Sequence, residues 1–318
     1  MRARRLSAWR HEYQHMSAAI FLLLPLVLAA GCLPESGMNG EDIAGRTAPL
    51  VSVCVSIPPQ AFAVERIGGE RVEIEVLVGP GQSPATYDPT PAQMVALDRA
   101  DLYFRIGVAF ENALMVRIER TMPDLQIVDL REGITLLRLP DHQHGGGGHD
   151  NCAHGAMDPH TWLNPGLMAV QARTIADSLT RHDPEGADIY AVNLSLLEAD
   201  LERVDEEIGE ILAPVRGGQM FVFHPAFGYF AEAYGLEQVA IEIEGKEPSS
   251  QQLGSIIAQG REQRVKAIFV QPEFSTAAAT AVAREVGAEV VSIDPLARDY
   301  LHNLTEMARK VREALEDE

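Results

Sequence analysis

Cysteine and basic residues are both scarce in this chain. Three cysteines in 318 residues are too few for a disulfide framework or a four-cysteine zinc site. Lysine and arginine number 26 against 46 acidic residues, so the formal net charge is −20. This balance argues against a general nucleic-acid-binding protein, which needs a basic face, and suits a cationic partner. A hydrophobic content of 46% is ample for buried cores, so we expect a folded chain of one large or two small domains.

The N-terminus carries an apolar run, residues 18–30, that is too short to span a bilayer. Four arginines precede it, and it ends in Leu-Ala-Ala-Gly-Cys, which resembles a bacterial lipobox. We therefore predict a lipoprotein signal peptide over residues 1–31, with Cys32 lipid-modified, and a flexible polar tether over 32–48. The predicted location is periplasmic or extracytoplasmic, with the chain anchored to the membrane. The alternative is an ordinary signal peptide whose cysteine is incidental.

Short apolar runs alternate with helical patterns through the rest of the chain, which favours parallel sheets with helices on both faces. The first set of candidate strands is Val51–Ile57, Val72–Val78, Leu102–Ile106 and Gln126–Asp129. The second set is Met220–Phe223, Val239–Ile243, Ala267–Val270 and Glu289–Ile293. The helical patterns between them include Pro91–Arg99, Ser249–Gln263 and Thr276–Gly287.

Two α/β lobes, each with a parallel four-stranded sheet, follow from this pattern. We place the N-terminal lobe at residues 49–183 and the C-terminal lobe at 216–318. A helical stripe of apolar residues fills 184–215, so a long rigid helix is expected to join the lobes. Cys54 lies in an apolar strand and is expected to be a buried thiol rather than a partner of Cys152.

Residues 141–156 form a low-complexity segment rich in glycine and histidine. Clustered imidazoles favour weak and labile metal capture, whereas the plainer interpretation is a solvated loop. The imidazoles belong to His142, His144, His149 and His154.

Three further segments place candidate ligands at defined points of the fold. His160 lies in Asp-Pro-His-Thr-Trp-Leu-Asn-Pro, where two prolines restrict the backbone. His224 and Asp294 each follow a predicted strand directly. Ligands of open parallel sheets bind outside the carboxyl ends of the strands, so these two side chains should converge, with His160 facing them from the first lobe. Two imidazoles and a carboxylate suit zinc or manganese better than copper(I), which prefers sulfur.

The same residues resemble a known family, the zinc and manganese solute-binding proteins of ATP-driven importers (the ZnuA/TroA-like group). The resemblance covers nearly all of residues 50–318, and the histidine-rich segment lies where zinc-type members carry theirs. It is carried by Gly81–Pro84 with Tyr87–Pro91, by Asp158–Pro165, by the His224 segment, by Glu247–Ser249 and by Asp294–Leu296. It implies one metal ion in a cleft between two lobes, with His160, His224 and Asp294 as ligands. It also implies a permease of the ABC type as the membrane partner.

One position departs from the family pattern. Members usually carry a histidine where this chain has Ala85, and a methyl group cannot bind a metal ion. Three alternatives follow. Water completes a site of three protein ligands; Glu247, Tyr87 or a histidine of 141–156 fills the place; or the site has acquired another role. A second departure is Gln271-Pro272-Glu273, where relatives more often have the acid first; the sequence assigns it no function.

The function that these observations predict is capture of a divalent metal ion, zinc with manganese as the alternative, and its delivery to an importer. We expect a monomer and no catalysis. A zinc hydrolase is the rival from another class, since three ligands and an open position are typical of catalytic zinc. The predicted mature chain has no His-Glu-x-x-His motif, because the one match, His11–His15, lies in the predicted signal peptide. An adhesin on the same scaffold is the third interpretation, because some relatives are described as adhesins.

Overall fold

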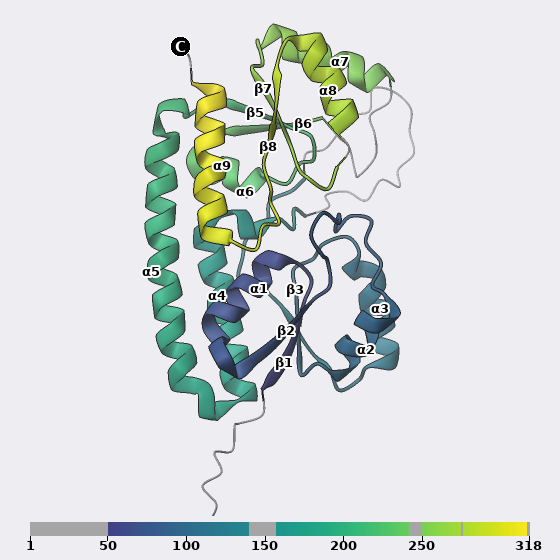
Figure 1. Ribbon diagram of the computed structural model, residues 1–318, viewed down its shortest axis with the longest axis vertical. Helices are drawn as coiled ribbons and strands as arrows, with labels where there is room; N and C mark the ends of the chain where they lie inside the picture. The colour runs from purple at the N-terminus through teal and green to yellow at the C-terminus, as the bar shows by residue number, and fades with distance from the viewer. Residues whose placement is uncertain (1–49, 140–156, 242–249, 275, 317–318) are drawn as a thin grey trace, which may run out of the picture. The chain divides into compact units, whose positions relative to one another are not determined.

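The computed structural model describes residues 50–139, 157–241, 250–274 and 276–316. Within these ranges the chain forms two parallel four-stranded sheets flanked by helices, which confirms the predicted α/β class (Figure 1). The predicted signal peptide and tether, including Cys32, lie outside the described residues, as does the whole histidine-rich segment 141–156. Among the helices of the described part, none has the length and apolarity that crossing a membrane requires.

The sheet of the N-terminal lobe has the strand order β2-β1-β3-β4. Its strands are β1 (Val51–Val55), β2 (Val72–Val76), β3 (Leu102–Arg105) and β4 (Gln126–Asp129), and its helices are α1 (Pro58–Gly68), α2 (Pro91–Arg99) and α3 (Glu111–Thr121). Local sequence explains where these helices begin. For α2, Thr90 accepts a hydrogen bond from the Gln93 amide, and Pro91 occupies the first turn, where its missing N–H costs nothing.

The sheet of the C-terminal lobe repeats this order as β6-β5-β7-β8. Its strands are β5 (Gln219–Val222), β6 (Glu237–Ala240), β7 (Ala267–Val270) and β8 (Glu289–Ser292), and its helices are α6 (Gly228–Tyr234), α7 (Ser250–Glu262), α8 (Thr276–Val286) and α9 (Tyr300–Leu315). All neighbouring strands are parallel, so their carboxyl ends share one edge of the sheet. Strand β7 lies between β5 and β8 and is buried along its whole length.

Predicted and observed boundaries of the helices and strands agree to within three residues. Strands β4 and β7 and helix α2 match their predicted ranges. Strand β1 ends at Val55 instead of Ile57, because Ser56 and Ile57 turn into α1. Strand β6 begins two residues earlier than predicted and ends at Ala240. The predicted fold therefore holds while the ends of its elements shift.

The helical segment predicted at 184–215 consists of α5 (Ala187–Leu212) with a 3₁₀ turn at each end, Pro184–Gly186 and Ala213–Val215. The N-terminal part of α5 packs against α1 and α4 (Pro165–His182), and its C-terminal part packs against α6 and α9 (Figure 1). Ion pairs reinforce both contacts. Asp200 accepts from Arg66 of α1 at 2.7 Å, and Glu207 from Arg309 of α9 at 3.1 Å.

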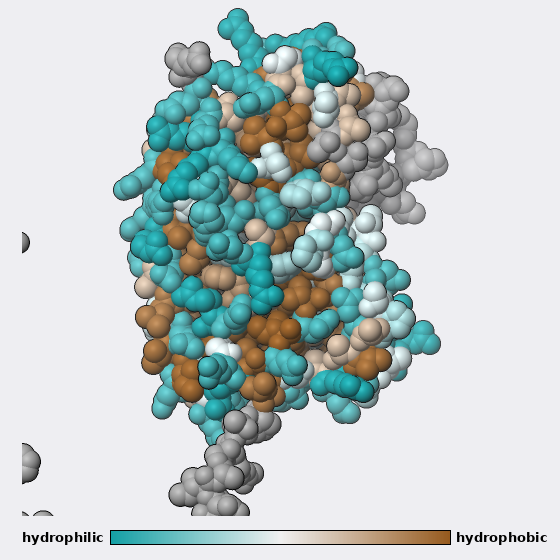
Figure 2. Space-filling view, in the orientation of Figure 1, coloured by the Kyte–Doolittle hydropathy of each residue, from teal (hydrophilic) through white to brown (hydrophobic). Residues whose placement is uncertain are grey.

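The apolar stripe predicted along this helix is only partly buried. Leu197, Leu201 and Val204, with Ile208 and Leu212, lie in the core, but Ile189, Val192 and Leu196 are 46–60% exposed. The helix contacts its neighbours along a narrower face than the run of apolar residues covers, and apolar atoms accordingly show over its N-terminal part in Figure 2.

A single apolar cluster runs from β1 through α4 and α5 to α9 and so joins the two sheets. A second cluster fills the opposite face of the C-terminal sheet, under α7 and α8. Cys54 is fully buried in the first cluster, and burial raises the pKa of its thiol, which confirms the expected inert thiol; Cys152 lies outside the described residues. Because the larger cluster spans both lobes, the segments between the sheets are packed against a common core.

Candidate metal centre

His160 is held by the carboxylate two residues before it. Asp158 is buried, and its Oδ1 accepts hydrogen bonds from the His160 amide at 2.9 Å and from His160 Nδ1 at 2.6 Å. His160 precedes a 3₁₀ turn, Thr161–Leu163; directly after this turn Asn164 caps α4 and Pro165 opens it, so the segment enters the helix in a fixed direction. A carboxylate on one imidazole nitrogen sets the tautomer and leaves Nε2 as the ligand atom, as in many metal sites.

The Asp158 segment is attached to the C-terminal lobe through Tyr229 of α6. The Tyr229 hydroxyl donates to the Asp158 carbonyl and accepts from the Leu137 amide, both at 2.9 Å. Gly228 allows this approach, because a Cβ there would lie 2.7 Å from Asp158 Oδ2. The Asp158 amide also donates to the Leu137 carbonyl at 2.9 Å, so described residues on either side of the histidine-rich segment are bonded to each other.

His224 follows β5, and a buried glutamine fixes its backbone. Gln271, directly after β7, accepts from the His224 amide at 3.3 Å and donates to its carbonyl at 2.8 Å. The imidazole stacks on Phe274 with ring centroids 5.1 Å apart and meets the His160 ring edge to face at 5.3 Å. The two predicted histidine ligands, one from each lobe, are therefore neighbours.

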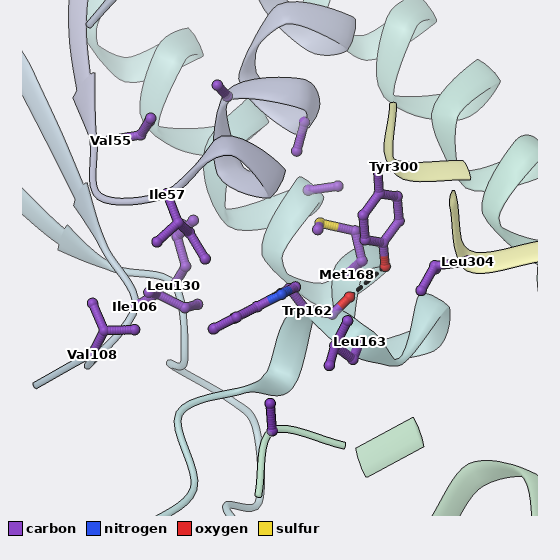
Figure 3. Packing of buried hydrophobic residues seen from close by; sticks show 14 of the residues in the cluster. Val55, Ile57, Ile106, Val108, Leu130, Trp162, Leu163, Met168, Tyr300 and Leu304 are labelled. Carbon is purple, nitrogen blue, oxygen red and sulfur yellow. Dashed lines mark hydrogen bonds between the residues drawn. The ribbon is translucent and has the colours of Figure 1, made fainter. Parts of the chain in front are cut away.

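Asp294 follows β8 and is linked to the His160 segment by a tryptophan. Trp162, whose ring lies 5.1 Å from that of His160, donates from Nε1 to the carbonyl of Pro295 at 2.7 Å. Its own carbonyl accepts from the Tyr300 hydroxyl at the start of α9, a bond visible in Figure 3 among the packed side chains. Thus Trp162 joins the segment that carries His160 to the segment that carries Asp294.

A cleft of about 330 Å³ opens between the lobes beside Asp294. Its other acidic side chain is Glu273, and both carboxylates are half-buried. Burial, together with the charge of Asp294, raises the pKa of Glu273 to about 7. The remaining lining is mostly apolar: Pro58, Val76, Val78, Gly79, Pro80 and Gly81 from one lobe, and Pro272, Leu296, Ala297 and Arg298 from the other.

The charges of this cleft are not balanced by the part of the chain that the structure describes. Within it, no Lys, Arg or His nitrogen lies within 4.0 Å of the Glu273 or Asp294 carboxylate. Arg298 lines the cleft, but its guanidinium pairs with Glu65 of α1 at 3.1 Å. A cation entering the cleft would therefore meet two half-buried carboxylates.

Polar residues also follow the strands of the N-terminal sheet, but they bond to one another. Buried Glu111 accepts from the Ser56 hydroxyl at 2.6 Å and from the amides of Ile106 and Gly107 at 2.9 and 2.7 Å. Buried Gln60 accepts from the Ser56 amide at 2.9 Å and donates to the Phe104 carbonyl at 3.0 Å. These groups fasten the ends of β1 and β3 together.

The predicted ligands are thus only partly assembled. His160 and His224 are adjacent, and Asp294 lines the cleft. No three His, Cys, Asp or Glu side chains among the described residues, however, form a group that could hold a metal ion. Tyr87 donates its hydroxyl to Gln93 at 2.6 Å, and burial raises the pKa of its phenol. Glu247, His142, His144, His149 and His154 lie outside the described residues.

Sequence reasoning assigned no role to Asp158, Gln271 or Glu273. Asp158 has a readable signal, since an acid two residues before a candidate ligand can reach its imidazole. Glu273 also has one, since it follows β7 as Asp294 follows β8. The role of Gln271 depends on a contact with His224, 47 residues earlier, and no local pattern indicates it.

Comparison with known proteins shows the family and the fold of the chain. Residues 53–314 match the family model described as the periplasmic component A of the zinc-uptake complex, ZnuA. A crystal structure of ZnuA superposes with a TM-score of 0.77 and 38% sequence identity, covering 84% of this chain and all of that one. The high-affinity zinc uptake protein ZnuA of Yersinia pestis is 29% identical and covers 77% of this chain and 83% of its own. The manganese-binding lipoprotein MntA of Halalkalibacterium halodurans is 26% identical and covers 85% of both chains.

Proposed function

Because the chain belongs to the ZnuA family of periplasmic zinc-uptake components, which are binding proteins and not enzymes, we propose that it captures a divalent metal ion, zinc, between its lobes and delivers it to an importer of the ABC type. The observation that carries the proposal is the pair His160 and His224. These imidazoles come from different lobes, and their ring centroids lie 5.3 Å apart. Asp294 supplies the third ligand from the cleft beside them.

The surroundings of the two imidazoles support this role. Asp158 occupies Nδ1 of His160 and leaves Nε2 for the metal ion, and Gln271 holds the backbone of His224. The mostly apolar lining of the cleft lowers the local dielectric constant, which strengthens the attraction between a cation and the Asp294 carboxylate. Metal-binding imidazoles must be neutral, so uptake should weaken in acid, below the ordinary imidazole pKa of about 6.5.

The N-terminal segment completes the proposal. Cys32, after lipid modification, would anchor the chain to the membrane on its periplasmic or extracytoplasmic side. Residues 32–48 would tether the lobes to this anchor. The histidine-rich segment would raise the local concentration of metal ions near His160, since it follows Leu137 and precedes Asp158, and these two flanking residues are bonded to each other. An importer can then receive the ion from a protein held close to the membrane.

The test is a competition titration with zinc and manganese on the chain from residue 32 onward, on His160→Ala, and on a deletion of residues 142–154. We expect one tightly bound ion, zinc in preference to manganese, its loss in His160→Ala, and its retention in the deletion. Metal binding that survives His160→Ala but disappears with the deletion would overturn the proposed site. A chain that retains no metal after exposure to zinc and dialysis would overturn the proposed function.

A further inference from the structure

Three adjacent strands of the C-terminal sheet each carry a potential ligand just beyond their carboxyl end. His224 follows β5, Glu273 follows β7, and Asp294 follows β8. Strand β7 is hydrogen-bonded to both of the others, so Glu273 leaves the sheet between the two predicted ligands. A side chain in this place faces the same space as its neighbours.

The contacts around Glu273 connect it to both neighbours. Phe274, the next residue, stacks on the His224 imidazole at 5.1 Å. Gln271, two residues earlier, turns inward and holds the His224 backbone through both of its amide atoms. Glu273 itself lines the cleft with Asp294, close enough for their charges to interact. The two polar side chains of the Gln-Pro-Glu segment therefore have different surroundings: Gln271 bonds to the His224 backbone, and Glu273 lines the cleft.

The charge of Glu273 has no cationic partner among the described residues, and the nearest guanidinium in the lining, that of Arg298, is paired with Glu65. In the N-terminal lobe, Ala85, which is not among the residues that line the cleft, offers only a methyl group where members of the resembled family carry an imidazole. The site thus lacks a ligand from one lobe and has an additional carboxylate from the other.

We propose that Glu273 is the fourth protein ligand of the captured ion and takes the place of the imidazole that Ala85 lacks. This inference rests on the proposed function and adds a ligand to its site. Two imidazoles and two carboxylates satisfy four-coordinate zinc, and the two negative charges neutralise the dication in a cleft with little other polar lining. Each added carboxylate also makes manganese a better competitor, so Glu273 would narrow the preference for zinc over manganese.

The test compares Glu273→Gln with Glu289→Gln in the chain from residue 32 onward. Both remove one negative charge from the same lobe without a change of size, but Glu289 begins β8 at the opposite edge of the sheet and is exposed. Loss of a partner outside the ligand shell typically weakens metal binding about 10–100-fold, so Glu273→Gln should weaken zinc at least tenfold. It should also change the visible absorption of bound Co²⁺, which reports the ligand set directly.

A restored imidazole supplies the second test. Ala85→His combined with Glu273→Gln should recover zinc affinity to within about threefold of the parent chain, if both residues serve the same coordination position. Equal zinc affinity and an unchanged Co²⁺ spectrum in Glu273→Gln and Glu289→Gln would overturn the inference while leaving the function intact. Absence of metal binding in the parent chain would instead overturn the function.

Discussion

The two sheets have the same strand order, but the residues beyond their carboxyl ends behave in opposite ways. In the N-terminal lobe, Ser56, Gln60 and Glu111 are buried and satisfy one another and the backbone. In the C-terminal lobe, Glu273 and Asp294 face a cleft and have no cationic partner among the described residues. One edge is closed by its own hydrogen bonds, and the other is open to a ligand.

This difference shows why family membership and fold do not by themselves locate the chemistry. Equivalent positions at the two sheet edges carry polar residues in both lobes, yet only one set is available to a cation. The N-terminal lobe contributes through the segment after β4, where Asp158 and His160 reach across to α6 and to His224. We therefore expect substitutions in the two edges to act on different properties of the protein.

The largest effect should come from opening the closed edge. Glu111→Ala removes the carboxylate that accepts from the Ser56 hydroxyl and from the amides of Ile106 and Gly107, so it should lower the free energy of unfolding by about 3–5 kcal/mol. Urea unfolding of the metal-free protein measures this, with exposed Glu119→Ala of the same helix as the control. A loss below about 1 kcal/mol would show that this edge is not held as described.

The open edge should respond in metal affinity instead. His224→Ala removes a ligand, so zinc affinity should fall by more than the roughly 100-fold that loss of an outer partner can cost, while the free energy of unfolding of the metal-free protein changes by less than about 1.5 kcal/mol. Chelator competition measures the affinity, and exposed His302→Ala of α9 is the matched control. Equal affinities in the two variants would contradict the comparison.

A smaller effect on zinc affinity is expected at Asp158, which bonds to the predicted ligand His160. Asp158→Asn keeps the shape of the side chain but removes the charge that orients His160 Nδ1, which should weaken zinc by about 10–100-fold. Isothermal titration of the folded variant with zinc provides the value. If the variant binds zinc as tightly as the parent chain, the short bond between Asp158 and His160 has no part in metal binding.

The smallest effect should lie away from both edges, at the corner between α4 and α5. Arg71 donates two hydrogen bonds to Asp183 at 2.7 and 2.8 Å, which lowers the pKa of that carboxyl. A lowered pKa means that the charged form stabilises the fold above the ordinary Asp pKa of about 3.9, and that this contribution is lost as the pH falls through the lowered value. Asp183→Asn should therefore lower the free energy of unfolding by about 1–2 kcal/mol at pH 7.

The parent chain and Asp183→Asn also test how this contribution to the free energy of unfolding depends on pH. In urea titrations between pH 7 and pH 2, the difference between the parent chain and Asp183→Asn should shrink below about pH 4, because protonated Asp183 no longer forms the ion pair. A difference that stays constant over this range would show that the pair with Arg71 contributes through packing and not through charge.

Much of the fold could be predicted from the sequence. The alternation of apolar runs and helical patterns gives two parallel sheets, and the rule that ligands gather beyond strand ends brought out His224 and Asp294. The Asp-Pro-His-Thr-Trp-Leu-Asn-Pro motif predicted His160 as a ligand. The apolar stripe of 184–215 predicts a wider buried face than the structure has, because a pattern of apolar residues does not say which of them a neighbouring helix covers.

Hydrogen bonds between residues far apart in the chain could not be predicted from the sequence. Ser56 and Glu111 are 55 residues apart, and Gln271 and His224 are 47 apart, so their hydrogen bonds depend on strand order and register. For Glu273 the strand-end rule applies, but two polar residues follow β7. Only the structure shows that Gln271 turns toward the His224 backbone while Glu273 turns to the cleft.

The most direct test of the account is the crystal structure of the zinc-loaded protein, with anomalous scattering at the zinc edge to locate the ion. The account predicts a single main peak about 2.0–2.1 Å from Nε2 of both His160 and His224, with the carboxylate of Asp294 in its ligand shell. A main peak held only by the histidines of residues 141–156, or one outside the space between the two imidazoles, would contradict it.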